Sequence, residues 1–169
     1  MIKIGIDVGS TTAKLVAVDE NDNLLFSKYE RHNAKAKETI LSFLKELLSE
    51  IGDKDISVRI TGSIGMGISE KCSLPFVQEV VAAAKAIQKD YSHVTSMIDI
   101  GGEDAKVVFF KDAEATDLRM NGNCAGGTGA FIDQMAIILG VNIDELNQLA
   151  MNATQVYPIA SRCGVFCKT

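Results

Sequence analysis

Two short segments, far apart in the chain, carry the same combination of carboxylate, small residues and lysine. Loop 1 runs Asp7-Val8-Gly9-Ser10-Thr11-Thr12-Ala13-Lys14, and loop 2 runs Asp99-Ile100-Gly101-Gly102-Glu103-Asp104-Ala105-Lys106. Small residues let backbone N–H groups approach phosphate oxygens, hydroxyls add donors, and a carboxylate can hold hydrated Mg²⁺. Loop 1 taken alone is equally compatible with a simple hairpin turn. Its repetition in loop 2 favours a pair of phosphate-binding loops.

The elements around loop 1 predict one α/β unit over residues 1–92. Apolar runs at 2–8 and 13–19 indicate strands on either side of loop 1, and turn residues precede a third strand at 24–31. Loop 1 therefore joins strand to strand and is not a Walker A loop. The remaining elements, in order, are a helix at 35–51 ending at Gly52, a strand at 56–61, a glycine-rich corner at 62–67 and a helix at 78–89.

The same organisation restarts over residues 93–169. Strands are expected at 94–100, 105–110 and 114–120, followed by a glycine-rich loop at 122–129 and a helix at 129–139. A further helix begins at Asn142, which forms a capping box with Glu145. The pattern βββαβα thus occurs once in full and once in a shortened copy.

Composition limits the classes of function. The 169 residues include 47% hydrophobic and 23% charged residues, which is typical of a globular chain. A formal net charge of -5 and the lack of a Lys/Arg run argue against nucleic acid as a partner. The sequence has no signal-peptide h-region and no stretch of ~20 apolar residues. These features predict a cytoplasmic protein that does not enter a membrane.

Four cysteines and two histidines are further candidates for chemistry. In a reducing compartment, Cys72, Cys124, Cys163 and Cys167 are free, reactive or metal-binding and do not form a disulfide framework. No CxxC pair occurs, which disfavours a zinc ribbon, a thioredoxin motif or a ferredoxin-type run. The histidines, His32 and His93, lack metal-ligand spacing and are predicted to lie on the surface.

The paired loops resemble the two phosphate segments of the actin, sugar-kinase and Hsp70 superfamily. The resemblance implies an actin-like ATPase (ribonuclease H-like) fold of two α/β domains, with ATP and Mg²⁺ in the cleft between the loops. By motif match, Asp7 and Asp99 would hold Mg²⁺ through water and orient the attacking water. Glu79 matches a recurrent acidic residue that faces the γ-phosphate, although a solvated glutamate at a helix start is the alternative. The remaining residues expected to contact nucleotide are Gly9, Ser10, Thr11, Thr12, Lys14, Gly101, Gly102, Glu103, Asp104, Lys106, Gly127 and Thr128.

Two cysteine-containing motifs restrict the resemblance to one family within this superfamily. They are Arg119-Met120-Asn121-Gly122-Asn123-Cys124-Ala125-Gly126-Gly127-Thr128-Gly129 and Ser161-Arg162-Cys163-Gly164-Val165-Phe166. Across nearly the whole chain the sequence is similar to the BcrAD/BadFG type of ATPase, the activators of 2-hydroxyacyl-CoA dehydratases and benzoyl-CoA reductases, and especially to its large activase-like branch. In that family the matching cysteines of two subunits hold one [4Fe–4S] cluster, so the resemblance implies that Cys124 and Cys163 are ligands in a homodimer.

The other two cysteines are expected to be small buried hydrophobes. Cys72 lies in a predicted loop, and Cys167 departs from the family pattern. Since Cys167 follows Cys163 by four residues, it is an alternative thiol if that segment is helical.

The resemblance implies an ATP-driven electron donor. A ferredoxin or flavodoxin would reduce the homodimer, which would pass a low-potential electron to a 2-hydroxyacyl-CoA dehydratase or related reductase. A cluster-free, sugar-type kinase and a nucleotide-binding regulatory domain of the same fold remain the alternatives. The chain stops before the adenosine-contacting segment of the superfamily, so the second domain is expected to be truncated, and the fragment to bind nucleotide weakly or to be inactive.

Overall fold

The computed structural model describes residues 1–112, 114–121, 124–158 and 163–168 of the chain. It divides into two units, Met1–His93 and Val94–Thr169, each with its own sheet. Residues 122–123, where part of the predicted glycine-rich loop falls, and Ser161 and Arg162 of the second cysteine motif lie outside the described residues.

The first unit contains the three consecutive strands predicted around loop 1 and the strand predicted at 56–61. Its strands are β1 (Ile2–Val8), β2 (Thr12–Val18), β3 (Leu24–Arg31) and β4 (Ile56–Thr61). They are ordered β3-β2-β1-β4, with β1 antiparallel to β2 and parallel to β4. The sequence prediction of these strands is confirmed to within one residue at each end.

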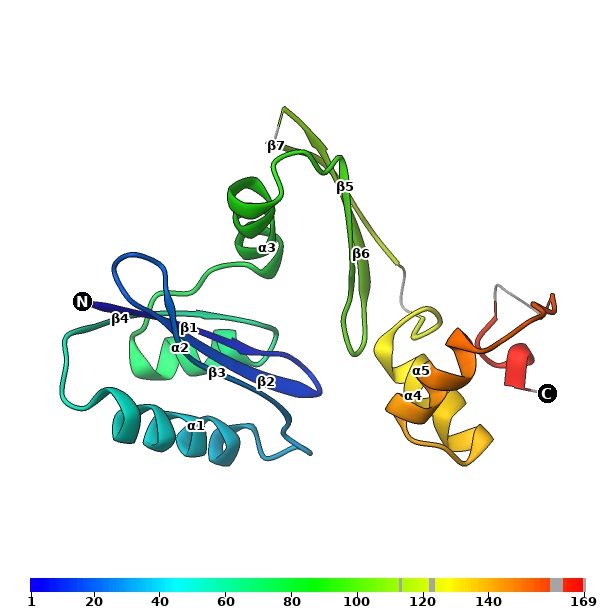
Figure 1. The fold of residues 1–169 in the computed structure, drawn as a ribbon, viewed down its shortest axis with the longest axis horizontal. Helices are drawn as coiled ribbons and strands as arrows, with labels where there is room; N and C mark the ends of the chain where they lie inside the picture. The colour runs from blue at the N-terminus through cyan, green and yellow to red at the C-terminus, as the bar shows by residue number, and fades with distance from the viewer. Residues whose placement is uncertain (113, 122–123, 159–162, 169) are drawn as a thin grey trace. The chain divides into compact units, whose positions relative to one another are not determined.

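Buried and more exposed side chains alternate along these strands, so the sheet has a core face and an opposite face. On β1, Ile2, Ile4, Ile6 and Val8 are buried against the helices on one side of the sheet. Because successive side chains of a strand point to opposite faces, Asp7 lies on the other side. The core face is covered by α1 (Ala36–Ile51), with Ile40, Phe43 and Leu47 buried, and by α2 (Gly65–Cys72) (Figure 1).

Helix α2 corrects the prediction of a glycine-rich corner at 62–67. Two glycines within eight residues are unfavourable for a helix, which is why the sequence indicated a turn. Tertiary contact requires one of them, because a Cβ on Gly65 would stand 2.9 Å from the Ile60 side chain of β4. Cys72 consequently ends a helix and does not lie in a loop. Helix α3 (Glu79–Asp90) follows as predicted.

The second unit has an antiparallel sheet in the order β5-β6-β7. Its elements are β5 (Ser96–Ile100), β6 (Ala105–Lys111), β7 (Glu114–Met120), α4 (Gly129–Leu139), α5 (Ile143–Met151) and the short 3₁₀ helix η1 (Phe166–Lys168). The predicted capping box is confirmed: Glu145 N–H donates to Asn142 Oδ1 at 2.9 Å, and Asn142 N–H donates to Glu145 Oε2 at 2.8 Å. Helices α4 and α5 pack together (Figure 1).

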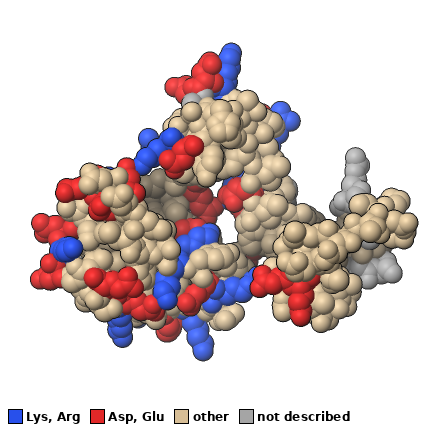
Figure 2. Space-filling model, viewed as in Figure 1, with Lys and Arg blue, Asp and Glu red and all other residues tan. Residues whose placement is uncertain are grey.

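On the surface, charges of both signs are mixed. In the face shown in Figure 2, lysine and arginine side chains are interspersed with aspartate and glutamate and form no continuous basic patch. Among the described residues, no helix is both long and apolar enough to cross a bilayer.

An ion-pair node connects the β2–β3 turn to two other elements of the first unit. Asp22 accepts hydrogen bonds from Lys89 of α3 at 2.6 Å and from Lys3 of β1 at 2.9 Å. These bonds, that of Lys89 first, lower the pKa of Asp22 from 3.8 to about 2. The node therefore joins the last turn of α3 to the β2–β3 turn through exposed ion pairs.

We expect the Asp22 node to stabilise the chain only where its carboxylate is ionised. Since folding lowers the pKa of Asp22, its stabilisation is complete above pH 3.8 and disappears as the pH falls through about 2. Urea unfolding of the wild type and of Asp22→Asn at several pH values should give curves that differ near neutral pH and converge in acid. A stability difference that grows in acid would contradict the assignment.

Candidate functional site

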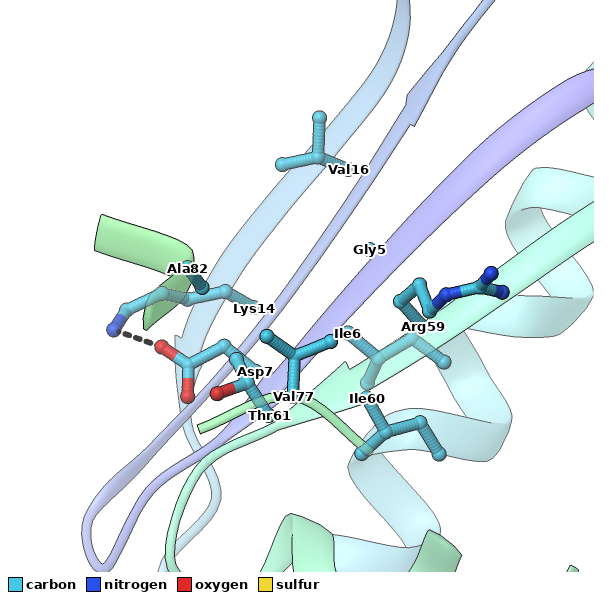
Figure 3. A pocket seen from close by; sticks show the side chains of 10 residues that line it. All are labelled: Gly5, Ile6, Asp7, Lys14, Val16, Arg59, Ile60, Thr61, Val77 and Ala82. Atoms are coloured by element: carbon cyan, nitrogen blue, oxygen red, sulfur yellow. Dashed lines mark hydrogen bonds and ion pairs between the residues drawn. The ribbon is translucent and has the colours of Figure 1, made fainter. Parts of the chain in front are cut away.

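The strand register of the first unit places Asp7 directly opposite Lys14. These residues are cross-strand partners in the β1–β2 pair, so their side chains emerge on the same face. Lys14 Nζ donates to Asp7 Oδ2 at 2.7 Å, and Thr61, the partner of Asp7 on β4, flanks the carboxylate on its other side (Figure 3). Loop 1 and the end of β4 thus present a carboxylate, an ammonium group and a hydroxyl together.

Two polar atoms at this position have no hydrogen-bond partner in the described structure. They are Asp7 Oδ1 and Thr61 Oγ1, and both are buried. An unpaired buried polar atom costs free energy, so such atoms are rare and mark positions where a ligand can supply the missing bond. A carboxylate oxygen and a hydroxyl oxygen are suitable acceptors for the water shell of Mg²⁺.

The Asp7 site opens on a pocket of about 410 Å³ on the face opposite the core. Figure 3 shows Asp7, Lys14 and Thr61 at one end of it. The other lining residues are mostly apolar and come from β1, β2, β4, α3 and the segment leading into α3: Gly5, Ile6, Val16, Arg59, Ile60, Val77 and Ala82. The pocket therefore combines the Asp7–Lys14 pair at one end with a mostly apolar wall that also includes Arg59.

His32 is buried and bonded to loop 1, so the prediction that it lies on the surface is wrong. Its side chain is 4% exposed, its Nε2 lies 3.0 Å from the Gly9 carbonyl, and its N–H donates to the Thr11 carbonyl at 3.2 Å. A carbonyl only accepts, so Nε2 carries the proton in this contact. No local pattern of residues could indicate this role, because β3 and loop 1 meet only in the folded sheet. His93 is exposed, as predicted.

Gly62 is a second residue of the site that sequence reasoning missed. It follows β4 with φ of +96°, and a Cβ there would collide with the Val8 carbonyl and stand 2.7 Å from Asp7 Oδ1. Only glycine has access to this conformation without strain while leaving room for the carboxylate. A glycine directly after a strand was the available signal, but many turns share it.

Glu79 is the first residue of α3 and is half-buried. Val77 and Ala82 from the same segment line the pocket beside Asp7, which places the start of α3 near loop 1. The proposed contact of Glu79 with a γ-phosphate stays a prediction.

Loop 2 repeats the arrangement of loop 1. Asp99 and Lys106 are cross-strand partners in the β5–β6 pair. Lys106 is buried, and its Nζ lies 2.8 Å from Asp104 Oδ2 and 3.9 Å from Asp99 Oδ2. The Gly101 N–H donates to the Asp104 carbonyl at 2.9 Å and closes the turn. Each unit therefore ends its first strand pair in an acidic residue opposite a lysine.

The N-terminus of α4 is bonded to loop 2. Gly129 N–H donates to the Gly101 carbonyl at 2.8 Å, and Ala130 N–H donates to the Gly102 carbonyl at 2.9 Å. A Cβ on Gly129 would stand 3.1 Å from the Gly101 oxygen, so glycine permits the close approach. Two of the N–H groups that a helix start leaves without an intrahelical partner are thereby satisfied by loop 2.

The predicted nucleotide residues Gly127 and Thr128 lie just before this junction. Thr128 is fully buried, and its hydroxyl donates to the Ala125 carbonyl at 2.6 Å. Gly127 has φ of +81° with open space around it. Thr128 therefore stabilises the turn into α4, and its contact with nucleotide stays a prediction, as does that of Gly127.

The segments that carry Cys124 and Cys163 pack against each other. A Cβ on Gly126 would stand 3.4 Å from Cys124 Sγ, and one on Gly164 would stand 3.6 Å from the Gly126 Cα. Cys124 is exposed, its Sγ accepts a hydrogen bond from Gly126 N–H at 3.3 Å, and Cys163 is half-buried. Thiolates are the ligands that iron–sulfur clusters use, so the two segments fit such a group in chemistry and proximity.

The other two cysteines, Cys167 and Cys72, differ in burial. Cys167 is half-buried and its N–H donates to the Cys163 carbonyl at 3.1 Å, so it lies one helical turn beyond Cys163. Cys72 is exposed in the first unit, which corrects the expectation that it is a buried hydrophobe: α2 ends there and no further turn covers it. Within the described ranges, no group of three or more His, Cys, Asp or Glu side chains is arranged to hold a metal ion.

Comparison with known proteins gives matches over nearly the whole chain. Residues 4–169 match the family model described as the BadF/BadG/BcrA/BcrD ATPase family. The (R)-2-hydroxyglutaryl-CoA dehydratase activating ATPase of Acidaminococcus fermentans is 29% identical over 98% of the chain and 64% of its own length. The 2-hydroxyisocaproyl-CoA dehydratase activator of Clostridioides difficile is 31% identical over 100% of the chain and 64% of its own length.

Solved structures agree with the predicted fold. The activator of the 2-hydroxyisocaproyl-CoA dehydratase from Clostridium difficile, determined with bound ADPNP, superposes with a TM-score of 0.86 at 30% identity, covering 99% of this chain and 63% of that one. The α/β, actin-like ATPase fold predicted from the paired loops is thereby confirmed. The chain spans slightly less than two thirds of the length of these relatives.

We expect Gly62→Ala to destabilise the first unit by roughly 2 kcal/mol or more, because alanine at positive φ is strained and its methyl would collide with the Val8 carbonyl. Gly67→Ala is the matched control: Gly67 lies inside α2 with open space around it, so alanine should stabilise by about 0.5–1 kcal/mol. Urea unfolding midpoints measure both. Equal shifts in the two variants would refute the steric role of Gly62.

Replacing His32 with phenylalanine keeps the ring and removes the bond to the Gly9 carbonyl. We expect a loss of about 1–3 kcal/mol of stability, since the carbonyl loses its buried partner. We also expect faster amide exchange in loop 1. His93→Phe, at an exposed position, should change neither measurement. Unchanged exchange in loop 1 of His32→Phe would rule out its role in holding the loop.

Proposed function

Because the chain belongs to the BadF/BadG/BcrA/BcrD ATPase family, we propose that its parent protein is an ATP-hydrolysing activator that passes a low-potential electron to a 2-hydroxyacyl-CoA dehydratase or a related reductase. The observation that carries this proposal lies in the second unit. There loop 2 is hydrogen-bonded to the start of α4 and, through Asn121, to the segment bearing Cys124, and the segment bearing Cys163 packs against Gly126.

Loop 1 and loop 2 are proposed to bind the phosphates and Mg²⁺ of ATP and to promote its hydrolysis. Asp7 and Asp99 would hold hydrated Mg²⁺ and orient the attacking water, and the unpaired Asp7 Oδ1 supports this role for loop 1. Lys14 and Lys106 would balance the negative charge of the phosphates, which is the usual contribution of a lysine at such a site. The relative solved with ADPNP bound supports ATP as the nucleotide.

A [4Fe–4S] cluster is proposed for the two cysteine segments. Cys124 and Cys163 would each donate a thiolate, and because such a cluster takes four, a second copy of the chain would supply the other two. When bound, the cluster would supply one-electron transfer at low potential. The exposed Cys124 and the contact between Gly126 and Gly164 support this assignment.

The partners follow from the same proposal. A ferredoxin or flavodoxin would deliver the electron to the homodimer, and the acceptor would be the dehydratase, as the names of the relatives suggest. Hydrolysis can drive the transfer only if nucleotide binds the states of the protein with different affinity. Loop 2 and α4 are the elements of this chain that join the nucleotide residues to Cys124.

Anaerobic reconstitution with iron and sulfide, followed by metal analysis and EPR, tests the cluster. Wild-type protein should become brown and paramagnetic on reduction, whereas Cys124→Ala and Cys163→Ala should bind little iron. Cys72→Ala, in the first unit, is the matched control and should bind iron like the wild type. A colourless protein, or full iron content in Cys124→Ala, would remove the cluster from the proposal.

ATP hydrolysis by the same preparations tests the loops. Asp7→Asn and Asp99→Asn keep the shape of the carboxylate and remove its charge, so we expect hydrolysis to fall by at least about 100-fold. Retained hydrolysis in both would contradict their role. A cluster-free protein that phosphorylates a small molecule would favour a kinase instead, and nucleotide binding without turnover would favour a regulatory domain.

A further inference from the structure

Asn121 forms three hydrogen bonds that join loop 2 to the Cys124 loop, which is defined as the described residues 124–129 leading into α4. Its Oδ1 accepts from Ala105 N–H at 3.0 Å, and its Nδ2 donates to the Cys124 carbonyl at 2.9 Å. Its own N–H donates to the Ala105 carbonyl at 3.0 Å. Ala105 lies in loop 2 between Asp104 and Lys106, so one side chain touches both functional segments.

The chemistry of these bonds requires an amide. Oδ1 must accept from an N–H group, and Nδ2 must donate to a carbonyl. Aspartate at this position would keep the first bond but set a carboxylate oxygen against the Cys124 carbonyl. Alanine would lose both side-chain bonds. Asparagine is the residue of this size that satisfies both neighbours.

Backbone bonds make a second connection between the same parts. At the far end of the Cys124 loop, Gly129 and Ala130 donate to the carbonyls of Gly101 and Gly102. The Cys124 loop is therefore attached to loop 2 at its beginning by Asn121 and at its end by the start of α4. Of the two attachments, the one at Asn121 adds two side-chain bonds to the backbone bond between Asn121 N–H and the Ala105 carbonyl, whereas the one at α4 consists of backbone bonds.

We propose that Asn121 is a positioning residue that fixes the Cys124 thiol relative to loop 2 and carries a change at loop 2 to that thiol. The inference rests on the proposed function, in which loop 2 contacts nucleotide and Cys124 is a cluster ligand. It goes beyond that function by naming the side chain through which the two are coupled.

The test uses the chain without a cluster and with one thiol. Cys72, Cys163 and Cys167 are replaced by serine, which leaves Cys124, and its alkylation by iodoacetamide is followed by mass spectrometry. Without nucleotide, Asn121→Asp should raise the alkylation rate about fivefold, the factor that corresponds to one lost hydrogen bond, and Asn121→Ala, which loses both side-chain bonds, should raise it further. An unchanged rate in both variants overturns the positioning role.

A matched chain that retains only Cys72 is the control. Cys72 lies at the end of α2 in the other unit, so its alkylation rate should not respond to either variant. Equal acceleration at Cys72 and Cys124 would mean that the variants unfold the chain generally, and would count against a specific role for Asn121.

Coupling is tested by adding Mg²⁺ with ADPNP. With Asn121 present, saturating nucleotide should change the Cys124 rate, and in Asn121→Asp this change should be clearly smaller while the affinity for ADPNP is retained, because only the attachment through the start of α4 remains intact. A nucleotide effect of the same size in Asn121→Asp overturns the coupling. If no nucleotide binds even at ADPNP concentrations high enough for the weak binding expected of this chain, the proposed ATPase function fails, whereas the positioning role is still decided by the rates without nucleotide.

Discussion

Loop 1 and loop 2 both depend on one constraint of antiparallel pairing, which is the strand register. In each unit, this register places an acidic residue opposite a lysine where the strands end. Asp7 faces Lys14 across β1–β2, and Asp99 faces Lys106 across β5–β6. Directly opposed residues share a face, so each pair converges without help from a distant segment. A slip of one residue would move the carboxylate to the core face. The buried alternation of β1 fixes that register in the first unit.

Near these pairs, two polar side chains and one glycine keep the loops in place. His32 bonds the Gly9 carbonyl beneath loop 1, Gly62 leaves space for the Asp7 carboxylate, and Asn121 joins Ala105 to Cys124 beside loop 2. Buried polar groups need partners, so these contacts are specific in a way that apolar packing is not. Among the described residues, Asp7 Oδ1, Thr61 Oγ1 and His32 Nδ1 are buried without a partner, and a bound, hydrated cation would supply one to the first two.

Most of the secondary structure could be predicted because it is a local property. Alternation identified the strands, the Asn142 capping box identified the start of α5, and Gly52 ends α1 as expected. The failures share a tertiary cause. Helix α2 was missed because Gly65 disfavours a helix, and only its contact with Ile60 explains the glycine. His32 was placed on the surface because its burial depends on a loop that precedes it by more than twenty residues in the sequence.

By itself, the sequence determined the fold class, the two acidic loops and the cysteine motifs, since each is written in residue types at close spacing. The tertiary structure decided what those residues touch. It paired Asp7 with Lys14, set the Gly126 and Gly164 segments in contact, and linked loop 2 to the Cys124 loop through Asn121. Such contacts depend on strand register and on the close approach of glycines, and both arise only when distant parts of the chain pack together.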